Sequence, residues 1–218
     1  MPRVWFDKDD VCIGDFEKFW NKCDNKLQYG GSRGLYGTGT AFTLKVIWGA
    51  IQWLIQLTDE DVVADFGLGE GKFLHSISFF CNFPDMQGFG WENAEQRYHR
   101  SLEILAENPL PNCKFNLGNS AEVKNWAPAT IIYNYDGSPQ THIELEHRTI
   151  MLNIFRSESV RLLFTTKMSP SVWRDYFAHN PDWWNRVKRE WVVFKTQKLS
   201  LASHKIKVVV VLFVIIVN

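Results

Sequence analysis

The sequence predicts an α/β fold in which helices flank a mostly parallel central sheet. From Asp61 onward, apolar runs typical of strands alternate with segments of helical periodicity. A glycine-rich turn follows the first of these strands directly, as in a strand–turn–helix unit. Residues 208–217 are wholly apolar and rich in Val and Ile, which favours a core strand. A helix that crosses a membrane needs about 20 such residues, so we expect no membrane span there.

The order of the elements follows from the same periodicities. We expect strands near 61–66, 87–91, 113–117, 129–134, 160–166 and 206–217. We expect helices over 71–80, 93–107, 140–155 and part of 171–191, after an amphipathic helix over 43–57. The helix over 93–107 is expected to begin with Asn93 as its N-cap, and Pro109 follows its end.

Composition places the chain among ordinary globular proteins. It has 218 residues, of which 45% are hydrophobic and 22% charged, enough to bury a full core. The 24 basic and 24 acidic residues cancel, so net charge gives no argument for a nucleic-acid or membrane partner. The four cysteines form no C-x-x-C pair, which predicts neither a zinc cluster nor a disulfide framework and favours a reducing, intracellular compartment. The first ten residues hold no apolar run typical of a signal peptide.

The turn after the first strand carries the strongest functional signal. Gly67, Gly69 and Gly71 let the backbone turn tightly and approach a ligand closely. In a dinucleotide-binding G-x-G-x-x-G pattern the third glycine would stand where Lys72 stands, so a dehydrogenase fits less well. The alternative is a glycine turn that only joins a strand to a helix.

An acid precedes these glycines, and further polar residues end the next strands. With Asp65 before it, the G-x-G-x-G pattern resembles motif I of the class I S-adenosylmethionine-dependent methyltransferases. The resemblance implies a Rossmann-like fold with S-adenosylmethionine as cofactor and S-adenosylhomocysteine as product. Glu92 is then expected to bind the ribose hydroxyls, unless it is a solvated residue at a helix start. Asn119 and Ser120 are expected near the adenine edge.

The fourth strand ends in the unusual segment IIYNYDGSP. The side-chain oxygen of Asn134 could accept a hydrogen bond from an amine nucleophile, and Tyr135 could line its channel. The alternative is a simple Asp-Gly turn in an α/β loop.

Several segments together resemble the Dot1-type histone methyltransferases, which are non-SET enzymes that methylate a lysine in the core of histone H3. The resemblance covers roughly residues 35–170. Its segments are LYGTGTAF, then LTDEDVVADFGLGEG with Thr58, Asp59 and Asp61, then TIIYNYDGSP and VRLLFTTKMSP. Thr38 stands where the family has a glutamate, and Asn119 stands where it has an acid.

The resemblance implies a division of the chain and roles for its residues. Residues 1–58 would form a cap with a cofactor-covering loop, and residues 59–218 the catalytic domain. The cofactor would be held by Tyr36, Gly37, Thr38, Thr40, Asp65, Gly67, Gly69, Gly71, Lys72, Glu92, Asn119, Ser120 and Asn134. The catalytic residues would be Asn134 and Tyr135. The resemblance also implies histone H3 in nucleosomes as the partner and the nucleus as the location.

Other readings stay open. The chain could methylate another protein or a small-molecule amine, or it could be a binding module without activity. Arg186, Lys188 and Arg189 lie near tryptophans in the sequence and permit a weak contact with nucleosomal DNA, although a solvated helix face fits them better. His142 and His147 do not form an H-E-x-x-H arrangement, so no metal is assigned.

Overall fold

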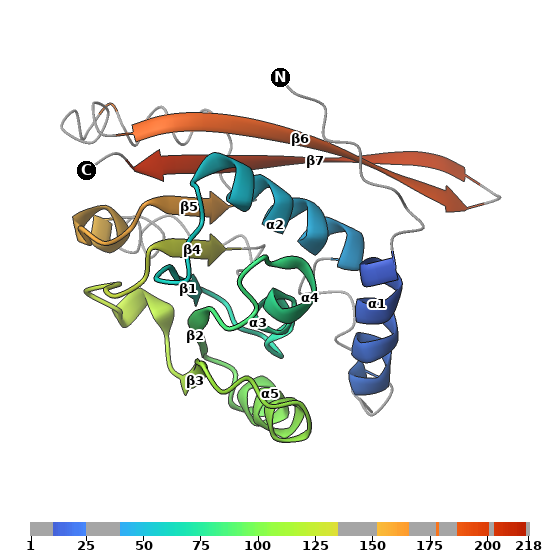
Figure 1. The fold of residues 1–218 in the computed structure, drawn as a ribbon, viewed down its shortest axis with the longest axis horizontal. Coiled ribbons are helices and arrows are strands. Elements are labelled where there is room, and N and C mark those ends of the chain that lie inside the picture. Colours follow the sequence, from blue (N-terminus) through green and yellow to red (C-terminus); the bar gives the residue numbers. More distant parts are fainter. Residues whose placement is uncertain are drawn as a thin grey trace.

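A seven-stranded sheet runs through the middle of the molecule, with helices packed against it (Figure 1). The structure is a computed structural model, and it describes residues 11–24, 40–134, 152–165, 178, 187–200 and 203–216. The strands are β1 (Val62–Asp65), β2 (Gln87–Glu92), β3 (Cys113–Leu117), β4 (Ile131–Asn134), β5 (Leu162–Thr165), β6 (Val187–Ser200) and β7 (Ser203–Ile216). Their order across the sheet is β3-β2-β1-β4-β5-β7-β6. The first five are parallel, and β7 runs antiparallel to both β5 and β6.

Short helices alternate with the parallel strands. They are α1 (Val11–Asp24), α2 (Ala41–Leu54), α3 (Lys72–His75), α4 (Ile77–Phe80), α5 (Glu95–Glu107) and the 3₁₀ turn η1 (Ser120–Glu122), and residues 152–156 are also helical. Thr40 caps α2, because its hydroxyl oxygen accepts a hydrogen bond from the Thr43 N–H at 3.1 Å. None of the helices in the described segments is long and apolar enough to cross a bilayer.

The expected mostly parallel α/β fold is confirmed, and the six expected strands are all present with ends shifted by a few residues. Two helix details were wrong. The helix expected over 71–80 is broken at Ser76, whose hydroxyl donates to the Phe73 carbonyl at 2.6 Å and accepts from the Trp48 indole N–H at 2.8 Å. The N-cap of α5 is Ala94, not Asn93, and the Ala94 N–H donates to the Glu92 carboxylate at 2.9 Å.

The C-terminal region differs most from expectation. The strand β6 was not expected. A helix was expected in part of 171–191, and of this range the structure describes Ala178, which is helical, and residues 187–191, which belong to β6. Each residue of β6 pairs with one of β7, so a partner far along the chain decides the conformation. Of the helix expected over 140–155, only 152–155 fall within the described residues, and these are helical.

Both faces of the sheet are covered, as a parallel sheet requires. Alternate residues of the central strands enter two separate apolar clusters: Val63, Tyr133 and Phe164 face one, and Ala64, Ile132 and Leu163 face the other. The first cluster also contains residues of α1, α2, α3 and α4.

Four stacked rings join the helices to the sheet inside the first cluster. Trp48 of α2 stacks on Phe73 of α3, with ring centroids 5.1 Å apart. Phe73 stacks on Tyr133 of β4 at 3.6 Å, and Tyr133 stacks on Phe164 of β5 at 5.0 Å. The stack therefore fixes the position of α2 and α3 over β4 and β5.

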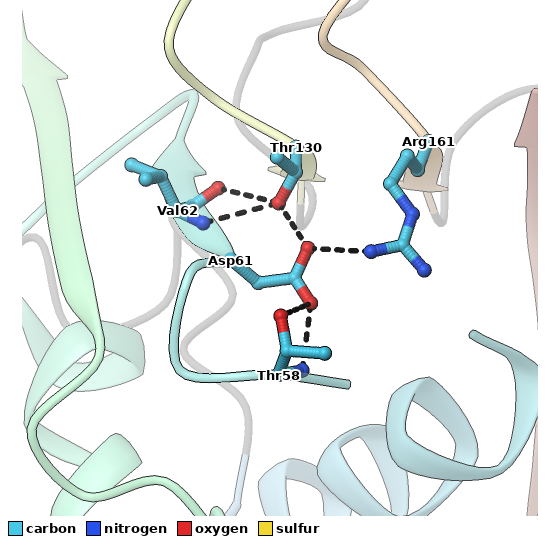
Figure 2. A network of polar contacts seen from close by, with 5 residues as sticks. All are labelled: Thr58, Asp61, Val62, Thr130 and Arg161. Atoms are coloured by element: carbon cyan, nitrogen blue, oxygen red, sulfur yellow. Dashed lines mark hydrogen bonds and ion pairs between the residues drawn. The ribbon is translucent and has the colours of Figure 1, made fainter. Parts of the chain in front are cut away.

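A buried carboxylate ties together the amino-terminal ends of three strands (Figure 2). Asp61, Thr130 and Arg161 each directly precede a strand: β1, β4 and β5. The Asp61 carboxylate accepts hydrogen bonds from the Thr130 hydroxyl at 2.7 Å, the Arg161 guanidinium at 2.9 Å and the Thr58 N–H at 2.9 Å. The Thr130 hydroxyl oxygen in turn accepts from the Val62 N–H at 3.0 Å. This network has a structural role, since it lies at the edge opposite the carboxyl ends of the strands.

We predict that Asp61→Asn lowers the free energy of unfolding by about 2 to 4 kcal/mol, because buried donors lose a charged acceptor. Asp59→Asn changes a neighbouring exposed acid and is expected to stay within about 0.5 kcal/mol. Urea unfolding followed by circular dichroism measures both values. Equal stability of the two variants would contradict the role given to the network.

Candidate functional site

Polar residues end three neighbouring strands at the carboxyl edge of the sheet. Asp65, Glu92 and Asn134 are the last residues of β1, β2 and β4. Their exposed fractions are only 2%, 6% and 2%. Ligands of open α/β sheets bind outside this edge, so three buried polar side chains here indicate a binding site.

The glycine turn between β1 and α3 is bound to these strand ends by its backbone. The Gly67 N–H donates to the Asp65 carboxylate at 3.3 Å, and the Gly69 N–H donates to the Glu92 carboxylate at 2.8 Å. The Leu68 N–H donates to the Trp91 carbonyl at 2.9 Å. The turn is thereby held against the ends of both β1 and β2.

Two of the glycines adopt conformations that other residues rarely take. Gly69 has φ +57°, and a Cβ there would stand 2.8 Å from the Arg97 guanidinium. Gly71 has φ +84°, forms the N-cap of α3, and would place a Cβ 2.8 Å from the Phe115 ring. The backbone therefore requires glycine at both positions, and at Gly71 the packing against Phe115 requires it as well.

The electrostatics of the site centre on Asp65. Burial raises the pKa of this carboxyl to about 7, and the nearby Glu92 carboxylate adds to the rise. The hydrogen bond from Gly67 and the positive charge of Arg97 lower the pKa in part. A cation bound beside Asp65 would favour its ionised form.

The side chain of Asn134 includes a buried hydrogen-bond donor that is unsatisfied in the described structure. Its side-chain Nδ2 is buried and has no hydrogen-bond partner within the described part of the chain. Such a group costs about 1 to 3 kcal/mol unless something accepts its protons. A ligand with an acceptor oxygen or nitrogen would meet that need.

The other predicted site residues lie in different surroundings. Asn119 caps η1 by accepting from the Ala121 N–H at 2.9 Å, and Ser120 follows it in a buried position. The Lys72 ammonium lies over the Trp20 ring of α1, 5.3 Å from its centroid. Thr40 is exposed at the start of α2. Tyr36, Gly37, Thr38 and Tyr135 lie outside the described residues.

The sequence analysis did not identify Arg97 as a residue of this site. It is in the first turn of α5, next to Gly69 and close enough to Asp65 to influence its titration. The sequence gives no sign of this role, because Arg97 is far from the glycine turn along the chain and only the fold brings the two together.

Several solved structures share this fold. The precorrin-6y C5,15-methyltransferase of Geobacter metallireducens superposes with a TM-score of 0.61 at 12% identity, over 88% of this chain and 95% of that one. A SAM-dependent O-methyltransferase of Thermotoga maritima gives 0.58 at 8% identity, over 96% and 72% of the two chains. TYW2 of M. jannaschii, in complex with AdoMet, gives 0.52 at 16% identity, over 87% and 80%.

At these identities the likeness establishes the fold. The chain has the Rossmann-like class I methyltransferase fold, as the sequence predicted. No protein-family model matches the sequence, and no curated protein matches it either.

We predict that Gly71→Ala destabilises the protein by about 2 to 4 kcal/mol, through left-handed strain and overlap with Phe115. Gly14→Ala is the matched control, because a Cβ at this position of α1 meets nothing within 4 Å. The control is expected to gain up to about 1 kcal/mol from helix propensity. Thermal unfolding compares the two, and a Gly71→Ala protein as stable as the control would refute the packing described.

We predict that wild-type stability relative to Asp65→Asn falls as pH rises from about 4 to 7. Below about pH 4 the Asp65 carboxyl is protonated in both the folded and the unfolded protein. Between about pH 4 and pH 7 only the folded protein keeps this proton, so folding becomes less favourable as the pH rises. Each unit of pKa shift is worth about 1.4 kcal/mol. Burial also lowers the pKa of His75 to about 4, but His75 is present in both proteins and cancels. Urea unfolding midpoints of the wild-type and Asp65→Asn proteins, measured across this pH range, test the prediction. A difference between the two midpoints that does not change with pH would contradict it.

Proposed function

We propose that this protein binds S-adenosylmethionine at the carboxyl edge of its sheet and transfers the methyl group to a substrate. The observation that carries the proposal is the pair of hydrogen bonds by which the glycine turn meets Asp65 and Glu92. The class I methyltransferase fold supports it, as does the AdoMet in the similar structure of TYW2.

The residues present fit this cofactor. Glu92 accepts one backbone hydrogen bond on each carboxylate oxygen and keeps free lone pairs for the ribose hydroxyls. Asp65 would stand near the positively charged methionine part, where its carboxylate balances charge. The buried Nδ2 of Asn134 supplies a donor without a partner in the described structure. When bound, S-adenosylmethionine supplies a methyl group activated by its sulfonium.

The protein's own contribution is then to position the acceptor and exclude water. An attack on a methyl group is in line, so orientation supplies much of the rate. Asn134 ends β4 beside the cofactor residues, and its Oδ1 could accept a hydrogen bond from an amine nucleophile. Asn134 is therefore the residue we assign to substrate orientation.

We place the substrate among amines of a small molecule or of a protein other than histone H3. Two of the similar structures are named for precorrin and for O-methyl transfer, which supports a substrate outside chromatin. The chain resembles these structures in its fold, and the substrate class is our inference.

Methyl transfer to a lysine of histone H3 is the second candidate. It is favoured by the Dot1-like segments, in which Thr40 begins a helix as that resemblance implies. A nuclear location and nucleosomes as partner belong to this candidate alone. Methyl transfer to reconstituted nucleosomes, with free metabolites as competing acceptors, separates the two substrates.

We predict that Asp65→Asn, Glu92→Gln and Asn134→Ala each weaken S-adenosylmethionine binding about tenfold or more, because hydrogen bonds to charged or buried groups are lost. Asp85→Asn is the matched control, since this exposed acid precedes β2 at the opposite edge of the sheet. Titration calorimetry measures the four affinities. Failure of the wild-type protein to bind S-adenosylmethionine would refute the proposal, while binding without transfer to any acceptor would indicate a binding module.

A further inference from the structure

Arg97 lies against the glycine turn at the carboxyl edge of the sheet. It is in the first turn of α5, and a Cβ on Gly69 would stand 2.8 Å from its guanidinium Nη2. The N–H of the same glycine donates to the Glu92 carboxylate at 2.8 Å. One guanidinium and two buried carboxylates, those of Asp65 and Glu92, are therefore gathered around the turn.

Helix α5 itself does not explain an arginine at this position. The first turn of a helix favours negative side chains, because its N–H groups without partners carry partial positive charge. A positive charge in this turn is therefore slightly unfavourable for the helix. The two carboxylates at the strand ends account for it better, since they attract it.

The two carboxylates oppose each other's ionisation. Asp65 is 2% exposed and Glu92 6%, so water solvates neither charge well. Burial is the main reason that the pKa of Asp65 is raised to about 7, and the charge of Glu92 raises it further. The Gly67 N–H and the positive charge of Arg97 act in the opposite direction. Asp65 is therefore partly protonated at neutral pH, and Arg97 shifts the balance toward the charged form.

Among the described residues, the other titratable side chains beside Asp65 do not take this role. Those on the glycine turn and α3 are Glu70, Lys72 and His75. Glu70 is an acid, the Lys72 ammonium lies over an aromatic ring of α1, and burial lowers the pKa of His75 to about 4, which leaves it neutral at pH 7. On β4, Tyr133 and Asn134 are uncharged. Arg97 is therefore the cation that favours the charged form of Asp65.

We propose that Arg97 is a positioning residue for cofactor binding, which holds the Asp65 carboxylate in its charged form to receive the positively charged part of S-adenosylmethionine. The inference rests on the proposed function, because it concerns the same cofactor at the same edge of the sheet. The guanidinium itself repels a cation. If it acted on the positive charge of the cofactor directly, its removal would strengthen binding. If it acts through Asp65, its removal weakens binding.

The effect depends on pH in a defined direction. The cofactor is expected to bind the charged form of Asp65, so its affinity falls by up to about tenfold for each pH unit below the pKa of about 7. Without Arg97 the carboxyl keeps its proton to a higher pH, and the fall in affinity begins there. Well above both pKa values Asp65 is charged with or without Arg97, and the two affinities become equal.

The test measures the affinity for S-adenosylmethionine by titration calorimetry between about pH 6 and pH 8.5, for the wild type, Arg97→Gln, Arg97→Lys and Arg156→Gln. Arg156→Gln is the matched control, since it removes an exposed arginine from the helix over 152–156. The α-amino group of the cofactor titrates near pH 8, so each variant is compared with the wild type at the same pH. Arg97→Gln is also made in the Asp65→Asn protein, which completes a double-mutant cycle.

We expect Arg97→Gln to weaken binding about threefold to tenfold at pH 6 and by less than about twofold at pH 8.5. Arg97→Lys, which keeps the charge, and Arg156→Gln are expected to bind as the wild type. In the Asp65→Asn protein, Arg97→Gln is expected to cause no further loss. Three results would each overturn the proposal: a loss that is equal at every pH, a gain in affinity at pH 6, or a loss that persists in the Asp65→Asn protein.

A second measurement needs no cofactor. NMR of isotope-labelled aspartate carboxyl groups follows the titration of Asp65 in the free protein, and Asp65→Asn identifies its signal. If S-adenosylmethionine binds none of the proteins at any pH, the proposed function fails, and this titration alone decides whether Arg97 holds Asp65 in its charged form. A midpoint that moves to higher pH in Arg97→Gln supports that role, and an unchanged midpoint overturns it.

Discussion

The hydrogen bond from the Gly69 N–H to the Glu92 carboxylate is the constraint on which the candidate site depends. It fixes the glycine turn to the end of β2, while Gly90 in that strand leaves room for Leu68. A Cβ on Gly90 would come within 2.8 Å of the Leu68 side chain. The turn can therefore approach the strand closely, and Asp65, Glu92 and Arg97 are brought around one small region of backbone.

The two edges of the sheet divide stability and function between them. At the amino-terminal edge both oxygens of the Asp61 carboxylate accept hydrogen bonds, and the ends of β1, β4 and β5 are held together. At the carboxyl edge, burial raises the pKa of Asp65, and the buried Nδ2 of Asn134 has no partner in the described structure. The unfavourable free energy of burying these two polar groups can persist at a functional site when the surrounding structure holds them in place. The ring stack from Trp48 to Phe164 packs next to them in that way.

Local pattern was sufficient to predict the parallel strands and the glycine turn. The strands β1, β4 and β5 are short apolar runs, β2 and β3 carry apolar residues at alternate positions, and the three glycines closely follow the first strand. It failed where distant residues decide. The break at Ser76 depends on Trp48, and the unexpected strand β6 depends on pairing with β7. The structural role of Asp61 was missed for the same reason, because Thr130 and Arg161 reach it only in the folded protein.

The candidate site was predicted in part. Asp65, Glu92 and Asn134 could be found because polar residues at strand ends are conspicuous after apolar runs. Arg97 gave no such signal, since an arginine in a helix is most often a solvated residue. The direction of Lys72 toward Trp20 also could not be foreseen, because it depends on the packing of α1 beside α3.

The most direct test of the account is a crystal structure of the protein with S-adenosylhomocysteine. The account predicts the nucleoside at the carboxyl ends of β1, β2 and β4, with its ribose hydroxyls on Glu92 and an acceptor atom within reach of Asn134. A ligand bound elsewhere, or none at a saturating concentration, would contradict the central claim.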